Sequence, residues 1–238
     1  MTIFLLDEAT HDFPPPRLAD PIGLLAVGGD LSVDRLVKAY SSGIFPWFSE
    51  GEPVLWWSPD PRLVLYPDEL KISTSLRRVI NKGMFAIRFD TAFEDVITAC
   101  ATAKRKGAEG TWITKDMIAA YCALHGAGLA HSVEAWQDNH LVGGLYGVAI
   151  GRCFFGESMF SRVSNASKTA LVFLTTFLKL NCFKMIDCQM TTAHLLRFGA
   201  REIPRRRFLK ELEKIVSEPS PTGPWRFEDI EEELSLRR

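Results

Sequence analysis

Two carboxylates lie inside strongly apolar segments of the chain, where a charged side chain is costly to bury. Glu157 is part of the segment 154–160, and Asp187 is part of the segment 185–190. A buried charge destabilises a fold unless it is paired or hydrogen-bonded. Gln189 follows Asp187 at a spacing of two, so in a strand both side chains share one face. Such a pair either satisfies backbone groups or lets a carboxylate orient an amide toward a reacting amine.

Tryptophan side chains lie in segments rich in Gly, Pro and Ser rather than in periodic segments. Trp47 is part of GIFPWF, and Trp112 is part of EGTWIT. Such a residue often covers a hydrophobic core, but a flat aromatic face also stacks on an unpaired nucleotide base. Tyr40 and Tyr121 are close to these segments and are further candidates. The aromatic residues therefore indicate either lids over a core or a site for a single-stranded nucleotide end.

An apolar stripe accompanies the two carboxylates. Three leucines in the segment 165–179 have the i, i+3, i+7 spacing of one helix face. Such a stripe usually belongs to a core, but it can also form the wall of a pocket for a bulky apolar side chain, with Glu157 at the rim. The candidates for this wall are Leu145, Phe154, Met159, Leu171, Leu174, Leu178 and Ile186.

The elements that position these residues follow from capping residues and from changes in hydrophobic period. Helices are predicted over 33–40 with Ser32 as N-cap, 73–82 with Ser73 as N-cap, 92–102, 115–125 with Thr114 as N-cap, 165–179 and from Pro204 to about 216. Strands are predicted over 130–136, 141–150, 153–160 and 184–190. Prolines at 59 and 61 predict a domain junction, with a small domain over 1–61 and a second domain over 62–238. This order of elements is typical of an α+β fold.

The composition is that of an ordinary globular protein, with 238 residues, 47% apolar and 24% charged. These values exclude collagen-like, disordered and disulfide-framework classes. The net charge is −1, but it is unevenly distributed. Residues 1–61 carry three basic and nine acidic side chains, whereas residues 162–214 carry eleven basic and four acidic ones. This asymmetry is typical of solvated faces and also of proteins with a polyanionic partner.

The cysteines and the start of the chain bear on metal binding and location. Five cysteines without CxxC spacing argue against a disulfide framework and against a zinc site. The sequence MTIFLLDEATHDFPPP has only a short apolar run before acids and prolines, unlike a signal peptide or a membrane anchor. We therefore expect a cytoplasmic protein that binds neither metal nor membrane. Nothing indicates an obligate oligomer, so a monomer is expected.

Ten short motifs occur in order along the chain: GLLAVGGDLS, GIFPWF, LWWSPDPR, EGTWIT, HSVEAW, LVGGLYG, FFGESMFSR, NASKTAL, IDCQM and FGAREIPR. From about Gly23 to Arg206 the chain closely resembles the leucyl/phenylalanyl-tRNA–protein transferases of bacteria. The resemblance implies a small N-terminal domain followed by a C-terminal domain similar to GNAT acetyltransferases. It implies transfer of Leu or Phe, and of Met weakly, from aminoacyl-tRNA to the N-terminal α-amine of proteins that begin with Arg or Lys. The new N-terminus would mark the product for degradation.

The resemblance also implies how tRNA is bound. Trp47 and Trp112 would stack the terminal adenine, with Tyr40 and Tyr121 as further candidates. Basic clusters at Arg77 and Arg78, at 104–106 and at 205–207 offer contacts to phosphates. We expect Arg77 and Arg78 to follow the acceptor stem, because they lie on a predicted helix just after the domain junction.

The reaction implied is aminolysis of an ester that is already activated, so no cofactor is expected. The enzyme then mainly positions the reactants. Glu157 would grip the ammonium group of the esterified amino acid. Asp187 would polarise Gln189, which would orient the attacking amine and help to relay its proton. The seven apolar residues named above would line the side-chain pocket.

Two other functions are compatible with parts of the sequence. A CoA-dependent N-acetyltransferase would share the C-terminal domain type, but the segment 161–166 lacks the glycines of a pyrophosphate-binding loop. A non-catalytic module for RNA ends would leave Glu157, Asp187 and Gln189 unexplained. Within the resemblance, Thr192 and Ala193 before His194 depart from the more polar residues of some members, which argues against a direct role for this short loop.

Overall fold

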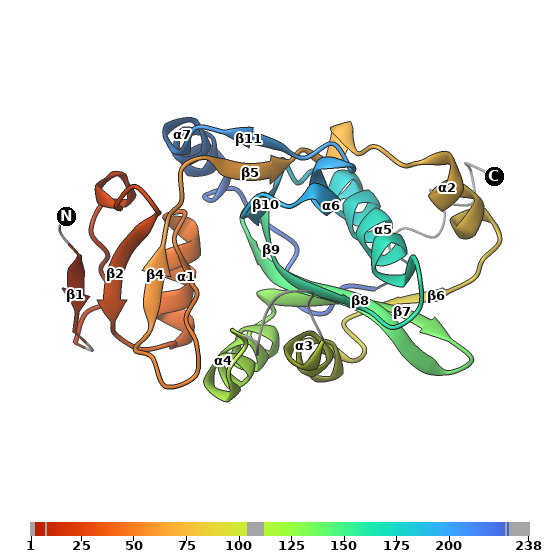
Figure 1. Ribbon diagram of the computed structural model, residues 1–238, viewed down its shortest axis with the longest axis horizontal. Coiled ribbons are helices and arrows are strands. Elements are labelled where there is room, and N and C mark those ends of the chain that lie inside the picture. The colour runs from red at the N-terminus through yellow and green to blue at the C-terminus, as the bar shows by residue number, and fades with distance from the viewer. Residues whose placement is uncertain (1–2, 8, 104–111, 227, 229–238) are drawn as a thin grey trace.

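The computed structural model describes residues 3–7, 9–103, 112–226 and 228, and the statements below concern these residues. Two β-sheets form its frame, with helices on both faces of the larger one (Figure 1). The mixture of helices and largely antiparallel sheets is an α+β architecture, as the sequence predicts. No helix of the described part is long and apolar enough to cross a membrane.

The first sheet is formed by the first 57 residues and has the strand order β1-β2-β4-β3. Its strands are β1 (Phe4–Leu6), β2 (Leu24–Gly28), β3 (Phe45–Pro46) and β4 (Leu55–Trp57). Sequence patterns do not predict this sheet, because strands of two to five residues are too short to show alternation. The helix expected in this region is confirmed as α1 (Val33–Ser41), where the Oγ of Ser32 accepts a hydrogen bond from the backbone N–H of Arg35.

The second sheet has the order β11-β5-β10-β9-β8-β7-β6. Its strands are β5 (Arg62–Leu65), β6 (Ala86–Phe89), β7 (Ala130–Gln137), β8 (His140–Ile150), β9 (Cys153–Ser161), β10 (Met185–Gln189) and β11 (Arg201–Ile203). β9 and β10 are parallel, whereas the other described neighbours are antiparallel. The four strands predicted from sequence are confirmed as β7 to β10, while β5, β6 and β11 escape prediction because they are short.

Helices cover both faces of the second sheet (Figure 1). The apolar helix α5 (Ala166–Leu180) lies on one face, and α3 (Phe93–Thr102) and α4 (Lys115–Gly126) lie on the other. The core beneath α3 and α4 continues into the first sheet, since Trp56 of β4 and Phe155 of β9 belong to the same hydrophobic cluster. A second cluster packs around α5. The first sheet is therefore packed against the second through one continuous core.

The remaining helices are α2 (Thr74–Asn81), α6 (Ala193–Leu196), α7 (Arg205–Ile215) and the 3₁₀ helices η1 (Pro16–Leu18) and η2 (Pro67–Glu69). The predicted N-caps are confirmed, because Ser73 accepts a hydrogen bond from Leu76 N and Thr114 accepts one from Met117 N. The helix expected after Pro204 is α7. The small helix α6 is not predicted, since a single turn has no periodic signal.

Candidate active site

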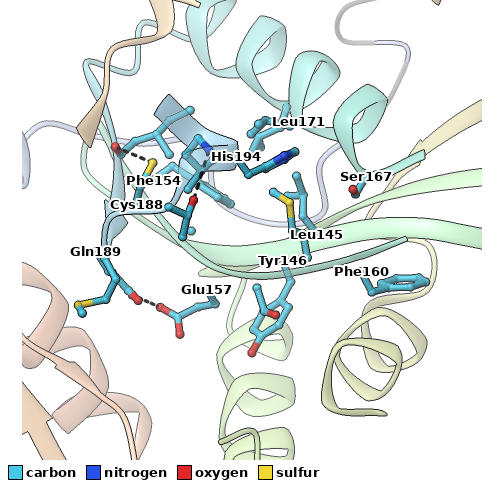
Figure 2. A pocket seen from close by; sticks show the side chains of 18 of the residues that line it. Leu145, Tyr146, Phe154, Glu157, Phe160, Ser167, Leu171, Cys188, Gln189 and His194 are labelled. Atoms are coloured by element: carbon cyan, nitrogen blue, oxygen red, sulfur yellow. Dashed lines mark hydrogen bonds between the residues drawn. The ribbon is translucent and has the colours of Figure 1, made fainter. Parts of the chain in front are cut away.

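A cavity of about 630 Å³ is lined by residues of β3, β8, β9, β10, α5 and α6 (Figure 2). Its volume lies within the range of sites for small molecules and cofactors. The cavity collects most of the residues that the sequence singles out, although they come from elements far apart in the chain.

The apolar wall of the cavity agrees with the sequence analysis at six of seven positions. Those residues are Leu145 of β8, Phe154 and Met159 of β9, Leu171 and Leu174 of α5, and Ile186 of β10. Leu178 is different, because it is fully buried in the core around α5 and does not line the cavity. The cavity ends before the helix does, so the last residue of the predicted stripe packs against protein.

The two tryptophans proposed to stack a base both line the cavity. Trp47 is 39% exposed, and Trp112 is half-buried. The ring of Trp57 lies 5.7 Å from that of Trp47, and its Nε1 donates a hydrogen bond to the Trp47 carbonyl oxygen at 2.7 Å. This contact holds the backbone at Trp47 while its ring remains accessible. A stacking role for Trp47 and Trp112 stays a prediction.

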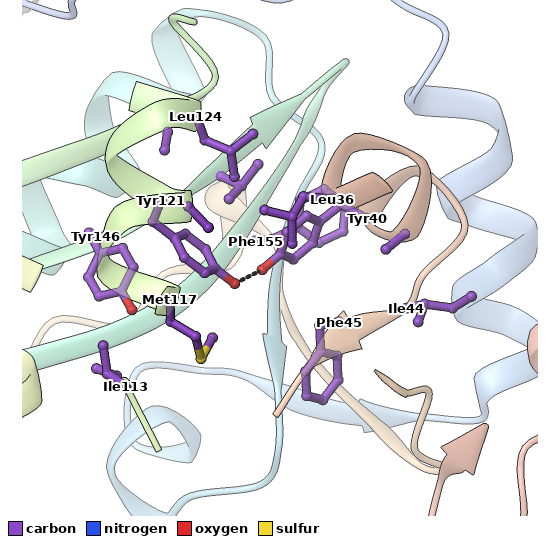
Figure 3. Packing of buried hydrophobic residues seen from close by; sticks show 14 of the residues in the cluster. Leu36, Tyr40, Ile44, Phe45, Ile113, Met117, Tyr121, Leu124, Tyr146 and Phe155 are labelled. Carbon is purple, nitrogen blue, oxygen red and sulfur yellow. Dashed lines mark hydrogen bonds between the residues drawn. The ribbon is translucent and has the colours of Figure 1, made fainter. Parts of the chain in front are cut away.

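Tyr40 and Tyr121 occupy a different environment from that expected of base-stacking residues. Both side chains are fully buried, Tyr40 in α1 and Tyr121 in α4, and their hydroxyls point toward each other (Figure 3). The Tyr40 ring packs against Phe155, with centroids 5.1 Å apart. Neither ring therefore presents a face on which adenine could stack, and the expectation from sequence is corrected here. Their hydroxyls contact Glu157 instead.

Glu157 is the charged centre of the cavity. Its Oε1 accepts hydrogen bonds from the Tyr40 hydroxyl at 2.8 Å and from Gln189 Nε2 at 2.7 Å, and its Oε2 accepts one from the Tyr121 hydroxyl at 3.0 Å. Part of the side chain faces the cavity (Figure 2), while protein surrounds the rest. Burial raises the pKa of Glu157 to about 7, although the three hydrogen bonds act to lower it.

Four oxygens at this centre, the two tyrosine hydroxyls and both oxygens of Glu157, share a limited number of protons. The Tyr40 and Tyr121 hydroxyls contact each other, and each also contacts one oxygen of Glu157. Burial raises the pKa of both tyrosines well above the usual value, so the hydroxyls keep their protons. With Glu157 ionised, two hydroxyl protons serve three contacts. A proton on Glu157 supplies the third, so the geometry also favours proton uptake by this carboxyl.

Asp187 does not polarise the side chain of Gln189. Both residues are buried, but the bond between them runs from the Gln189 backbone N–H to Asp187 Oδ1 at 2.9 Å. The Asp187 carboxylate also binds Arg62, and Asp187 is not part of the cavity lining. The Gln189 side chain instead donates to Glu157. The expectation that the Asp187 carboxylate contacts the Gln189 side-chain amide is therefore wrong. The strand pairing shifts register between the two residues, so their side chains do not share one strand face as a regular spacing of two would require.

Several lining residues escape the sequence analysis. They include Phe45, Cys188, Thr192 and His194. Thr192 of the short loop before His194 lines the cavity, although the sequence analysis argues against a direct role for this loop. Burial raises the pKa of the Cys188 thiol and lowers that of His194, so the thiol stays protonated and the imidazole is neutral near pH 7. Two motifs offered a signal for these residues: GIFPWF holds Phe45 beside Trp47, and IDCQM holds Cys188 between Asp187 and Gln189.

The basic clusters lie away from the cavity or outside the described residues. Arg77 and Arg78 are exposed on α2, which contributes no residue to the cavity lining. The cluster at 104–106 lies outside the described residues. In the third cluster, Arg205 donates to the Ser58 carbonyl oxygen and Arg207 pairs with Glu211 at 2.7 Å. In the described part of the chain, no three His, Cys, Asp or Glu side chains gather to hold a metal ion.

Comparison with known proteins adds independent information. The family model described as leucyl/phenylalanyl-tRNA protein transferase matches residues 64–213, and the one for its N-terminal domain matches residues 29–60. A leucyl/phenylalanyl-tRNA–protein transferase of Syntrophobacter fumaroxidans is 57% identical over 228 residues, covering 96% of this chain and 97% of the relative. The protein of that name from Nitrosospira multiformis is 59% identical over 218 residues, covering 91% and 94%.

Solved structures are more distant. The structure of L-PGS from Bacillus licheniformis has a TM-score of 0.37 at 10% identity, and the match covers 71% of this chain and 54% of that chain. A likeness of this size supports no statement about function.

Proposed function

This chain belongs to the leucyl/phenylalanyl-tRNA–protein transferase family, and we propose that it acts on the N-terminal α-amine of proteins that begin with Arg or Lys. As a member of the family it is an aminoacyltransferase that transfers Leu or Phe from tRNA to proteins. The proposal adds that Met is accepted weakly and that the new N-terminus marks the acceptor for degradation. The observation that carries it is Glu157, a carboxyl with a pKa of about 7 in a cavity that also holds an apolar wall and two tryptophans.

Two regions of the cavity bind two parts of the aminoacyl end of tRNA, the amino-acid side chain and the terminal adenine. The six apolar residues enclose the Leu or Phe side chain, for which burial in a dry site is favourable. Trp47 and Trp112 stack the terminal adenine, which binds without reading a sequence. The exposed Arg77 and Arg78 of α2 contact stem phosphates, which lie farther from the esterified end.

The chemistry forms an amide from an ester. The acceptor α-amine attacks the carbonyl carbon, the new C–N bond forms, and the bond to the ribose oxygen breaks. Free α-amines have a pKa of about 7.7–8.0, so a fraction is neutral near pH 7. Positioning of amine and ester supplies most of the rate enhancement.

Glu157 suits the proton transfer better than the gripping of an ammonium group. A carboxyl with a pKa of about 7 is protonated in about half of the molecules at neutral pH, which makes it a weak anchor for a cation. The same pKa suits a base that takes the proton of the attacking amine and returns it to the leaving ribose oxygen. The Gln189 amide and the two tyrosine hydroxyls stabilise the ionised form, which is present before Glu157 takes the proton and is restored when it returns the proton.

We further propose the arrangement of the whole protein. Residues 1–61 form the small domain and residues 62–238 a GNAT-like domain, which is supported by the passage from the first sheet to the second between β4 and β5. The acidic excess of residues 1–61 is complementary to an acceptor N-terminus with Arg or Lys. The protein is a cytoplasmic monomer that works without a cofactor.

One assay tests the function. Labelled Phe on tRNA is incubated with the protein and with a peptide that begins with Arg, and the labelled peptide is measured. The controls are the same peptide beginning with Ala, uncharged tRNA with free Phe, and acetyl-CoA in place of charged tRNA. Transfer only from charged tRNA to the Arg peptide is expected. Equal transfer to the Ala peptide would contradict the proposed acceptor specificity, and acetylation would favour the CoA-dependent alternative.

A further inference from the structure

We propose that Arg62 is a positioning residue, which aims the Gln189 side chain at Glu157 by holding Asp187 in one orientation. The inference rests on the proposed function, because it concerns how the proposed site is kept in its active geometry.

The first link is a fully buried ion pair between β5 and β10. Arg62 Nε donates to Asp187 Oδ1 at 2.8 Å, and Nη2 donates to Oδ2 at 2.6 Å, while both side chains are 0% exposed. The guanidinium group is also held over two rings, 4.8 Å from the Phe45 centroid and 4.5 Å from that of Phe208. Two parallel bonds and two flanking rings allow the carboxylate a single orientation.

The second link joins this carboxylate to the irregular end of β10. Asp187 Oδ1, already bonded to Arg62, also accepts the Gln189 backbone N–H at 2.9 Å. Gln189 has a φ of 59°, in the left-handed region that favours glycine, and the strand pairing shifts register at this point. A residue with a side chain adopts this conformation only where its surroundings enforce it. The bond to Asp187 supplies that constraint.

The third link reaches the reacting site. From its constrained backbone, Gln189 donates through Nε2 to Glu157 Oε1 at 2.7 Å (Figure 2). Asp187 and Arg62 do not line the cavity, so they act on substrate only through this chain of contacts. A buried ion pair is weak evidence for stability, since apolar residues of similar volume often replace one without loss. The bond from Asp187 to the Gln189 backbone indicates that the pair instead fixes the position of the Gln189 side chain.

Loss of the Arg62–Asp187–Gln189 contacts should change the pH dependence of the rate, which a general loss of stability would not do. The Gln189 hydrogen bond acts to lower the pKa of Glu157. If Gln189 swings away, the pKa of Glu157 rises, and the pH at which the rate reaches half its maximum moves upward with it. Removal of a hydrogen bond to a charged group corresponds to a fall in rate of about tenfold to a hundredfold.

The test compares Arg62→Lys with Arg205→Met in the full chain. The lysine variant keeps the positive charge but lacks the planar guanidinium group that binds both carboxylate oxygens. Arg205 is the matched control, because it also lies near the start of the second domain, where it donates to the Ser58 carbonyl oxygen, and it does not contact Asp187. The rate kcat is measured from pH 5.5 to 9 with phenylalanyl-adenosine and a peptide that begins with Arg. Arg62→Lys is expected to lower kcat about tenfold or more and to shift the profile upward. Arg205→Met is expected to leave both unchanged, because phenylalanyl-adenosine has no stem phosphates for a residue of the 205–207 cluster to contact.

A double variant separates geometry from folding. In a Gln189→Met background, Arg62→Lys is expected to have no further effect on kcat, because the group that Arg62 positions is absent. An equal fold-decrease in both backgrounds would show that Arg62 only supports the fold and would overturn the proposal. Unchanged kcat and pH profile in the single Arg62→Lys variant would overturn it as well.

A readout without turnover distinguishes this inference from the proposed function. The side-chain amide resonance of Gln189, assigned by its loss in Gln189→Met, is followed by ¹H–¹⁵N NMR. In Arg62→Lys it is expected to shift as it does in Glu157→Ala, where the acceptor is absent. An unshifted resonance would overturn the positioning role, even if the wild-type protein transfers amino acids as proposed. Failure of wild-type transfer would contradict the proposed function alone.

Discussion

The hydroxyl of Tyr40 in α1 donates a hydrogen bond to Oε1 of Glu157 in β9 at 2.8 Å, across 117 positions of sequence. The contact joins α1 of the N-terminal part to the carboxyl group that faces the cavity from β9. Because Tyr40 is fully buried, it also closes Glu157 off on that side. The small N-terminal part therefore contributes to the electrostatics of the site in addition to packing against it.

Replacement of Glu157 by Gln tests the proposed base. The variant keeps the shape of the side chain but cannot take a proton, so kcat is expected to fall by roughly 10²–10⁴-fold. In the wild type, kcat should rise as the pH passes about 7, because Glu157 must be ionised to accept the proton. The variant should lose this rise. A variant with wild-type kcat would remove Glu157 from the mechanism.

Tyr121→Phe separates a role of the hydroxyl from a role of the ring. The variant keeps an aromatic ring and loses the 3.0 Å bond to Glu157. Because that bond lowers the pKa of Glu157, the midpoint of the pH–rate profile is expected to move to higher pH. KM for phenylalanyl-adenosine should stay within about twofold, since the ring is buried away from the adenine. An unchanged midpoint with a higher KM would favour the stacking role instead.

Glu134 is a second buried carboxyl and predicts a pH dependence of stability. Burial raises its pKa from 4.5 to about 7, so the unfolded chain releases the proton first as the pH rises. The contribution of Glu134 to the free energy of unfolding therefore falls as the pH rises from about 4.5 to 7. Above pH 7 it is smaller than at low pH by on the order of 3 kcal/mol. Glu134→Gln should narrow the fall in Tm between pH 5 and pH 8, as measured by calorimetry.

The same variant is a matched control for Glu157→Gln. Glu134 is bonded to Ser132 and Thr91, at 2.6 and 2.8 Å, and does not line the cavity. Its replacement should leave the pH profile of kcat unchanged. If Glu134→Gln alters that profile as Glu157→Gln does, the rise near pH 7 reports folding and not proton transfer.

Leu174 and Leu178 form a matched pair on α5. Leu174 lines the cavity, whereas Leu178 packs in the core one turn further on. Leu174→Phe narrows the pocket and is expected to lower kcat/KM for Phe more than for Leu. Leu178→Phe should cost about 1–3 kcal/mol of stability by overpacking and leave the ratio unchanged. If Leu174→Phe leaves the ratio of kcat/KM for Phe to kcat/KM for Leu unchanged, as Leu178→Phe should, then Leu174 belongs to the core and not to the pocket.

Binding of tRNA is tested with a full and a minimal substrate. Trp112→Ala should raise KM for both charged tRNA and phenylalanyl-adenosine, since stacking on a base is worth roughly 1–3 kcal/mol. The double variant Arg77→Ala with Arg78→Ala should raise KM for charged tRNA only and flatten its dependence on salt.

The minimal substrate serves as the control for the arginine pair, because it has no stem phosphates. If the double arginine variant impairs phenylalanyl-adenosine as strongly as tRNA, α2 supports the fold and does not bind the stem. If Trp112→Ala impairs tRNA alone, Trp112 does not stack the terminal adenine.

Much of the molecule follows from the sequence by itself, because the signals are local. Ten ordered motifs identify the family, and relatives that are 54% to 59% identical confirm it. Helix caps such as Ser32, Ser73 and Thr114 bond to residues three positions on, so neighbours in sequence suffice to place them. The apolar wall of the cavity is also foreseen, because alternation and helical spacing mark buried faces.

Only the tertiary structure decides which polar groups meet. Tyr40, Tyr121 and Glu157 come together because α1, α4 and β9 pack around one core, and no local pattern relates positions 81 or 117 residues apart. Arg62 meets Asp187 because β5 and β10 are neighbours in the sheet, a pairing between residues 125 positions apart. Periodicity predicts that a side chain is buried, whereas its partner depends on strand order and on a local shift in register, which are properties of the assembled sheet.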